Sequence, residues 1–193
     1  MIILCDTSSI LLLLRIAPDM FIDQKYECIT IPEIFNEIFR TQKFKGKYPW
    51  RTDFKSKVKP LTYSSYKTSS YDELHKTIQR ILDACVPDSS SGQQFYLSPE
   101  DHALAACAIA KDCELSSGDT KLVAFLQQQF PDMFKGNLTA LEVINRWLEN
   151  KVLNWDDAKH AIVGDWKQKK EASQPASAVK QFKKLTEREY PGS

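Results

Sequence analysis

The stretch Met1-Ile2-Ile3-Leu4-Cys5-Asp6-Thr7-Ser8 decides the fold, because its apolar run ends abruptly on a carboxylate. A short apolar run that is followed by a helical pattern is typical of a buried parallel strand. A second such run, at 113–117, leads to Asp119. In open parallel sheets, the groups just past the strand ends face the ligand crevice. We therefore expect Asp6 and Asp119 to lie close together, where their repulsion favours a bound cation.

Strand-like and helix-like segments alternate along the chain. The expected strands are 2–5, 27–30, 113–117 and 133–138, and the expected helices are 11–16, 32–39, 71–85, 98–110, 122–130, 139–148 and 154–166. The turn-rich segment 87–92 is expected to form a mobile loop. Such alternation predicts an α/β protein with three α/β/α layers and a central parallel sheet of four to five strands.

The chain is long enough for one domain with a sizeable core, since it has 193 residues of which 42% are hydrophobic. We place this domain at 1–150, with an insertion at 41–70 that is rich in basic and aromatic residues. The remainder, 151–193, is expected to be a C-terminal extension made of one helix and a basic tail. The low apolar content of the tail predicts an extended or partly helical segment.

Composition limits the classes of protein that fit. The net charge of +1 excludes a globally basic nucleic-acid binder, although local patches remain open. The five cysteines are odd in number and form no C-x-x-C pair, so neither a disulfide framework nor a zinc site is indicated. The apolar run 10–14 is too short to span a bilayer. We therefore expect a soluble, cytoplasmic protein with no membrane partner.

Four carboxylates are placed to reach one end of the predicted sheet. Asp6 and Asp119 follow strands, Glu37 lies in the middle of the 32–39 helix, and Asp101 lies in the first turn of an alanine-rich helix. Clustered carboxylates prefer hard ions such as Mg²⁺ or Mn²⁺. Such an ion lowers the pKa of bound water and stabilises charge on a phosphoryl oxygen, which is the chemistry of phosphodiester hydrolysis.

Four ordered motifs over about residues 1–150 resemble those of PIN-domain ribonucleases. They are Asp6-Thr7-Ser8, Ile31-Pro32 followed by Glu37, Leu97-Ser98-Pro99-Glu100-Asp101, and Ser117-Gly118-Asp119. The first and third look most like the toxin nucleases of bacterial toxin–antitoxin pairs. The resemblance implies a PIN-like fold and a Mg²⁺- or Mn²⁺-dependent endoribonuclease, often a homodimer bound by a small inhibitory protein. It also implies an acidic set of Asp6, Glu37, Asp101 and Asp119. Gly118 departs from the pattern, because the family often has asparagine before the last acid.

Each of these carboxylates also has an ordinary structural explanation. The two that follow strands can cap the next helices, and Asp101 can complete a capping box with Ser98. Glu37 can form a surface ion pair with Arg40 or Lys43. The occurrence of all four acids in the expected order favours the functional interpretation.

Hydroxyl groups accompany the acids at both strand ends. Thr7, Ser8 and Ser117 are candidates to orient the carboxylates or a metal-bound water. They are equally well explained as turn and cap residues.

The segment between Arg40 and Lys67 is strongly basic, with Asp53 as its one acid, and aromatic residues are spread through it. Cations for phosphates and aromatic faces for unstacked bases suit a surface that binds single-stranded RNA. The expected RNA contacts are Lys43, Lys45, Lys47, Trp50, Arg51 and Lys55. The alternative is a flexible, solvated insertion whose aromatics cover the core or a dimer interface.

Two other classes of protein compete with the nuclease. A metal-dependent binding module of the von Willebrand A type needs D-x-S-x-S after its first strand, and Ile10 stands where the last serine belongs. A PIN-like fold that has lost activity and serves as an interaction scaffold remains open. A metal titration and a cleavage assay separate this scaffold from the nuclease.

Overall fold

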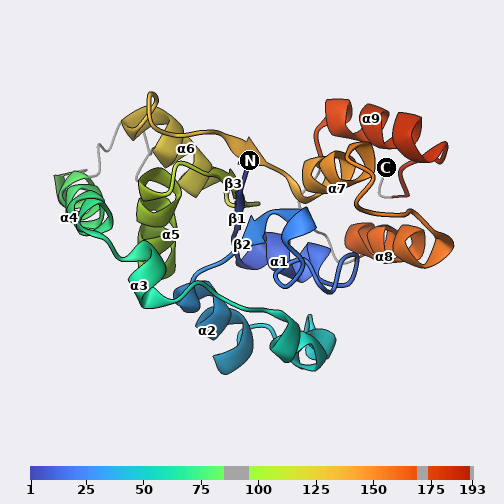
Figure 1. The fold of residues 1–193 in the computed structure, drawn as a ribbon, viewed down its shortest axis with the longest axis horizontal. Helices are drawn as coiled ribbons and strands as arrows, with labels where there is room; N and C mark the ends of the chain where they lie inside the picture. The colour runs from blue at the N-terminus through green and yellow to red at the C-terminus, as the bar shows by residue number, and fades with distance from the viewer. Residues whose placement is uncertain (85–95, 169–173, 192–193) are drawn as a thin grey trace.

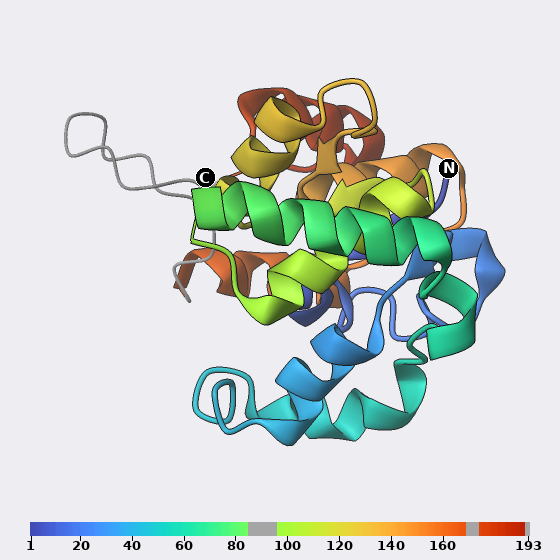
Figure 2. The ribbon, with the colours of Figure 1, turned by 90° about the vertical axis from the view of Figure 1, so that its left-hand side faces the viewer.

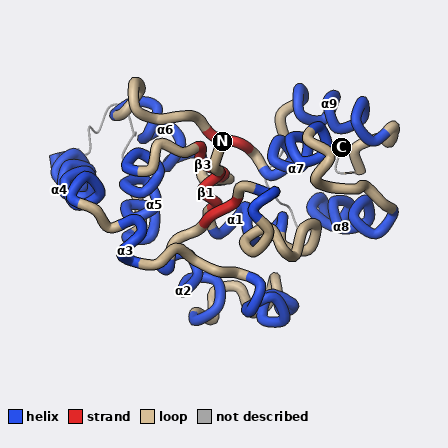
Figure 3. The backbone as a smooth tube through the Cα atoms, viewed as in Figure 1, coloured by secondary structure: helices blue, strands red, loops and turns tan. Residues whose placement is uncertain are grey.

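The computed structural model describes residues 1–84, 96–168 and 174–191. The expected loop at 87–92 lies outside them. The chain forms an α/β fold around a four-stranded, all-parallel sheet. In spatial order the strands are β2 (Cys28–Ile29), β1 (Ile3–Cys5), β3 (Glu114–Ser116) and β4 (Asn137–Leu138). The predicted parallel sheet is confirmed, and its short strands lie at the centre of the molecule in Figure 3.

The helices cover the sheet from both sides. They are α1 (Thr7–Leu13), α2 (Pro32–Arg40), α3 (Tyr63–Tyr66), α4 (Ser69–Ala84), α5 (Pro99–Ala110), α6 (Thr120–Gln129), α7 (Ala140–Glu149), α8 (Asp157–Gln168) and α9 (Ala176–Thr186), with 3₁₀ helices η1 (Gln24–Tyr26) and η2 (Pro49–Lys57). Figure 1 shows α4, α5 and α6 on one side of the strands and α1 and α7 on the other. This arrangement is compatible with three α/β/α layers.

Small and apolar residues explain how these layers pack. All of β1 is inaccessible to solvent, as expected for a strand with neighbours on both edges and helices on both faces. Four alanines of α5 are buried, namely Ala103, Ala105, Ala106 and Ala108, and α4 packs on α5 in Figure 2. On the other side, Trp147 of α7 is buried and its indole nitrogen donates a hydrogen bond to the Tyr26 carbonyl at 3.2 Å.

The register between β1 and β3 positions the functional edge. Cys5 lies opposite Ser116, and the amide of Asp6 donates to the Ser116 carbonyl at 3.0 Å. Asp6 and Ser117 are therefore the first residues past two neighbouring strands. Asp119 lies two residues beyond Ser117, at the start of α6.

Two expected boundaries need correction. The first helix begins at Thr7 rather than near 11, because Asp6 caps it by accepting a hydrogen bond from the Ser9 amide at 2.7 Å. The sequence predicts a last strand at 133–138, but β4 is only Asn137–Leu138. The chain before it turns, with the amide of Phe134 donating to the Phe130 carbonyl at 2.8 Å.

The C-terminal extension contains more ordered structure than its composition suggests. The expected helix at 154–166 is α8, and part of the expected tail forms a second packed helix, α9. Ala178 and Phe182 of α9 are buried, and α9 packs against α7. The side-chain Nδ2 of Asn145 on α7 donates to the Ala178 backbone carbonyl at 2.8 Å.

The insertion is folded over much of its length. It contains η2 and α3, and its Tyr48, Val58 and Tyr66 side chains are buried. Tyr48 and Tyr66 therefore extend the core, as the alternative interpretation of this segment expected in part. Within the described ranges, no helix combines the length and the apolar character needed to cross a membrane.

Candidate active site

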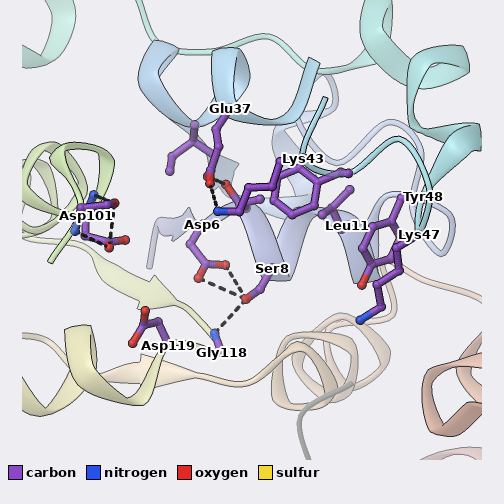
Figure 4. A pocket seen from close by; sticks show the side chains of 14 residues that line it. Asp6, Ser8, Leu11, Glu37, Lys43, Lys47, Tyr48, Asp101, Gly118 and Asp119 are labelled. Carbon is purple, nitrogen blue, oxygen red and sulfur yellow. Dashed lines mark hydrogen bonds and ion pairs between the residues drawn. The ribbon is translucent and has the colours of Figure 1, made fainter. Parts of the chain in front are cut away.

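A cavity of about 560 Å³ opens at the carboxyl edge of the sheet. This volume is in the usual range of ligand sites, and the place is where parallel sheets bind ligands. The cavity is lined by Asp6, Thr7, Ser8, Leu11, Ile34, Glu37, Lys43, Phe44, Lys47, Tyr48, Ser98, Asp101, Gly118 and Asp119. All four predicted carboxylates therefore line one cavity (Figure 4), although they come from four separate parts of the chain.

Asp6 is buried and held from several directions. Its Oδ1 accepts hydrogen bonds from the Ser9 amide at 2.7 Å and the Ser8 hydroxyl at 2.9 Å, and its Oδ2 accepts one from the Ser117 hydroxyl at 2.5 Å. Only 7% of the residue is exposed. Burial raises the pKa of Asp6, and the hydrogen bonds from Ser117, Ser9 and Ser8 oppose part of that rise. Two of the predicted hydroxyl residues thus orient this carboxylate.

Gly118 has a steric role that the sequence does not reveal. Its amide donates to the Ser8 hydroxyl at 3.0 Å. A Cβ atom at 118 would lie 2.9 Å from the Ser8 Oγ, so any side chain would push this hydroxyl away from Asp6. This close approach gives a physical reason for glycine where the resembling family often has asparagine.

Asp119 performs the capping role and keeps one oxygen available. Its Oδ1 accepts from the amides of Lys121 and Leu122 at 2.8 and 3.1 Å, at the start of α6. The Ser117 hydroxyl in turn accepts from the Asp119 amide at 2.9 Å, which links the two strand ends. Among the described residues, no hydrogen bond reaches the Oδ2 of Asp119.

Asp101 also combines a structural role with a place in the cavity. Its Oδ2 accepts from the Ser98 amide and hydroxyl at 3.0 and 2.8 Å, which completes the capping box of α5. Burial raises the pKa of Asp101, and the negative charges of Asp119 and Glu37 raise it further against the hydrogen bonds from Ser98. The carboxylates therefore repel one another across the cavity.

Glu37 extends from α2 and has both oxygens engaged. The Thr7 hydroxyl donates to its Oε2, and the Lys43 ammonium lies 2.5 Å from its Oε1. Hydrogen bonding to Glu37 raises the pKa of Lys43. The ion pair considered for Glu37 is therefore formed, with Lys43 as the partner, and Thr7 orients Glu37 rather than Asp6.

The donor atoms around the cavity suit a hard divalent ion. Carboxylate and hydroxyl oxygens predominate, and among the described residues neither cysteine nor histidine lines the cavity, so the set fits Mg²⁺ or Mn²⁺ better than Zn²⁺. In the described part of the chain, no three acidic, cysteine or histidine residues come close enough to hold a metal as they stand. The residues thus fit such an ion by chemistry, and Glu37 would have to leave Lys43 to join it.

The predicted RNA contacts divide into exposed and buried residues. Lys43 and Lys47 line the cavity, and Lys45 and Lys55 are exposed. Arg51 is only 4% exposed, and its guanidinium donates to the carbonyls of Ile38 and Thr41 at 2.8 and 3.2 Å. Arg51 cannot contact phosphates from this position, so we remove it from the RNA-binding set.

Trp50 packs against neighbouring side chains of the protein. Its ring meets Tyr48 and Phe54 edge to face at 6.0 and 5.6 Å, and the Arg15 guanidinium lies 5.6 Å from its centre. Trp50 is partly buried and does not line the cavity, so its contact with RNA stays a prediction. Phe44, which the sequence pattern did not single out, lines the cavity instead. The sequence feature that could have indicated Phe44 as an RNA contact is its position between Lys43 and Lys45.

The repulsion among the acids predicts how stability depends on pH. The pKa values of Asp6 and Asp101 are raised in the folded state. At a pH above these raised pKa values, the two charged carboxylates lower the free energy of unfolding. This destabilisation disappears as the pH falls towards about 3.9, the pKa of an aspartate in the unfolded chain. In metal-free buffer, Asp101→Asn should raise the melting temperature at neutral pH, by about 2–4 °C for each kcal/mol relieved, and by less in acid.

Thermal melts of both proteins over pH 4–8 test this prediction. The difference between them isolates Asp101 from the other titrating groups. A lower melting temperature for Asp101→Asn at neutral pH would show that the carboxylate stabilises the fold, in contradiction to the proposed crowding.

Comparisons with known proteins leave the family open. No protein-family model, curated protein sequence or solved structure matches this chain significantly.

Proposed function

We propose that this protein is a PIN-like, Mg²⁺- or Mn²⁺-dependent endoribonuclease that hydrolyses phosphodiester bonds in single-stranded RNA. The observation that carries the proposal is the meeting of four carboxylates in one cavity at the carboxyl edge of a parallel sheet. The basic residues Lys43 and Lys47 line the same cavity, so acids for a metal and cations for phosphates lie together.

The proposed chemistry assigns a task to each carboxylate. Asp6, Glu37, Asp101 and Asp119 would hold the ion, which supplies an activated water and stabilises charge on the phosphoryl oxygen when bound. The hydroxyls of Ser8 and Ser117 keep Asp6 oriented. One of these carboxylates would accept the proton that the water loses. The Oδ1 of Asp101 is available for this, because within the described residues the hydrogen bonds that its carboxylate accepts go to its Oδ2.

The resemblance to toxin nucleases extends the proposal to partners. A small inhibitory protein and a homodimer are the partners that such a toxin would have. A neighbouring reading frame for a small DNA-binding protein would support this part of the proposal. Its absence would favour a nuclease with another role.

An inactive scaffold is the second candidate function. It is favoured by the structural roles that all four acids fulfil. It is also favoured because, among the described residues, no three acidic, cysteine or histidine side chains lie close enough to hold a metal ion. A protein of this kind would bind partners without cleaving RNA.

Metal removal distinguishes the two candidates. We expect cleavage of a labelled single-stranded RNA in Mg²⁺ or Mn²⁺, complete loss of cleavage in chelator, and recovery when the metal is returned. Matched DNA and duplex RNA serve as controls for substrate class. Bound Mn²⁺ without cleavage of any substrate would favour the scaffold.

The exposed lysines of the insertion should control RNA affinity and its dependence on salt. Replacing Lys45, Lys47 and Lys55 together with glutamine removes up to three phosphate contacts. Each lost contact should reduce the slope of log K against log salt by about 0.7 for a single strand. Filter binding across a salt series measures this, with Lys111→Gln, outside the cavity, as the control.

Phe44→Ala provides the complementary variant, because stacking releases no counterions. It should weaken RNA binding by about 1–3 kcal/mol without changing the salt slope. If the lysine variant keeps the wild-type affinity and slope, the insertion is not the RNA-binding surface.

A further inference from the structure

Lys43 is a cation that directly engages the acidic cavity. It follows α2 in the chain and returns to that helix, where its Nζ lies 2.5 Å from the Oε1 of Glu37. In Figure 4 the ammonium meets Glu37 on the side of α2 that faces Asp6. The Lys43 side chain is 64% exposed and that of Glu37 is 17% exposed, so the charge sits at the end of a solvated stem.

Glu37 is distinguished from the other three acids by this pairing. Within the described residues, no lysine or arginine forms an ion pair with Asp6, Asp101 or Asp119. The second oxygen of Glu37 is taken by the Thr7 hydroxyl. A divalent ion that used Glu37 Oε1 would therefore compete with Lys43 for one atom.

We propose that Lys43 is a tethered cation that occupies Glu37 in the metal-free protein, and that a divalent ion displaces it. This inference rests on the proposed function, because it assumes that the carboxylates bind a metal. The displaced ammonium would stay at the cavity rim beside Lys47, where RNA phosphates would approach. Metal loading would then release a cation for the substrate.

The exposure of Lys43 keeps such an exchange inexpensive, because its ammonium can return to solvent although Glu37 is largely buried. Surface ion pairs shift an equilibrium by about 1.4- to 5-fold, so we expect Lys43 to hold Glu37 reversibly. A divalent ion with several carboxylate ligands competes favourably with a single ammonium. A lysine that only anchored the insertion would have no such relation to the metal.

Calorimetric titration with MnCl₂ in the absence of RNA tests the inference. Lys43→Met should bind Mn²⁺ about 1.4- to 5-fold more tightly than wild type, since the competitor is gone. Lys76→Met, which removes an exposed lysine on α4 outside the cavity, should bind as wild type does. Asp6→Asn should lose the binding, which assigns the heat to this cavity.

Melting temperatures give a second readout, in which Lys43→Met should differ from wild type in one direction without metal and respond more strongly when Mn²⁺ is added. Without metal, Lys43→Met should melt below wild type, because Glu37 has lost its cation. With saturating Mn²⁺, its rise in melting temperature should exceed that of wild type, as tighter binding to the folded state requires. Lys43→Gln repeats the test if the methionine variant does not fold.

The outcomes separate this inference from the proposed function. Equal or weaker Mn²⁺ binding by Lys43→Met overturns the tethered cation and leaves the nuclease standing. Tighter binding by Lys43→Met in a protein that cleaves no RNA supports the tethered cation and overturns the nuclease. If neither the wild type nor any variant binds Mn²⁺, both the tethered cation and the metal-dependent nuclease are overturned.

Discussion

Asp6→Asn is expected to lower the rate of metal-dependent RNA cleavage by more than about 100-fold, which is beyond the loss expected for an outer-shell partner of a metal. The substitution removes the negative charge that a divalent ion needs and keeps the shape of the side chain. The asparagine side chain retains an oxygen for the Ser9 amide, whose hydrogen bond to position 6 caps α1. The fold should therefore survive while the chemistry is lost.

Single-turnover cleavage of a labelled RNA in Mn²⁺ measures this effect. The matched control is Asp132→Asn, which changes an exposed acid that does not line the cavity and should leave the rate unchanged. Circular dichroism and melting curves check that both variants fold. A rate for Asp6→Asn within a few-fold of wild type would remove Asp6, and with it the acidic set, from the mechanism.

The layout of the sheet could be predicted because local patterns specify it. The apolar run before Asp6, the proline that opens α2 and the alanines of α5 each indicate their element without knowledge of the rest of the chain. The extent of β4 could not be predicted, since apolar residues also precede it in the turn. The packing of α9 depends on Ala178, which meets Asn145 of α7. It also depends on Phe182, which packs against Trp155 and His160. The low apolar content of the tail concealed these contacts.

The gathering of the acids at one edge followed from strand order, and their capping and ion-pair roles followed from local sequence. The contacts that join the two strand ends could not be predicted. The pairing of Asp6 with Ser117 joins residues 111 positions apart, and the approach of Gly118 to Ser8 depends on the same register. Such contacts leave no periodic signal in a single sequence. Composition likewise grouped all the cations of the insertion together, although tertiary packing divides them into exposed lysines and a buried arginine.

Arg51→Met is expected to lower the free energy of unfolding by about 3 kcal/mol or more. The Arg51 guanidinium donates to three backbone carbonyls, those of Ile38 at 2.8 Å, Thr41 at 3.2 Å and Tyr48 at 3.4 Å. Hydrogen bonds from a charged donor contribute about 1.5–3 kcal/mol each, and a buried carbonyl left without a donor costs about 1–3 kcal/mol. Methionine fills similar space and restores none of these bonds.

Urea denaturation measures this loss, which corresponds to a fall in melting temperature of about 6–12 °C. Lys55→Met is the matched control, because it changes an exposed cation of the same 3₁₀ helix and should alter stability by no more than about 0.5 kcal/mol. An Arg51 that served RNA would give the opposite result, with weaker RNA binding and unchanged stability. Because Ile38 and Thr41 lie at the end of α2 that carries Glu37, loss of Arg51 should also loosen the link between the insertion and the cavity.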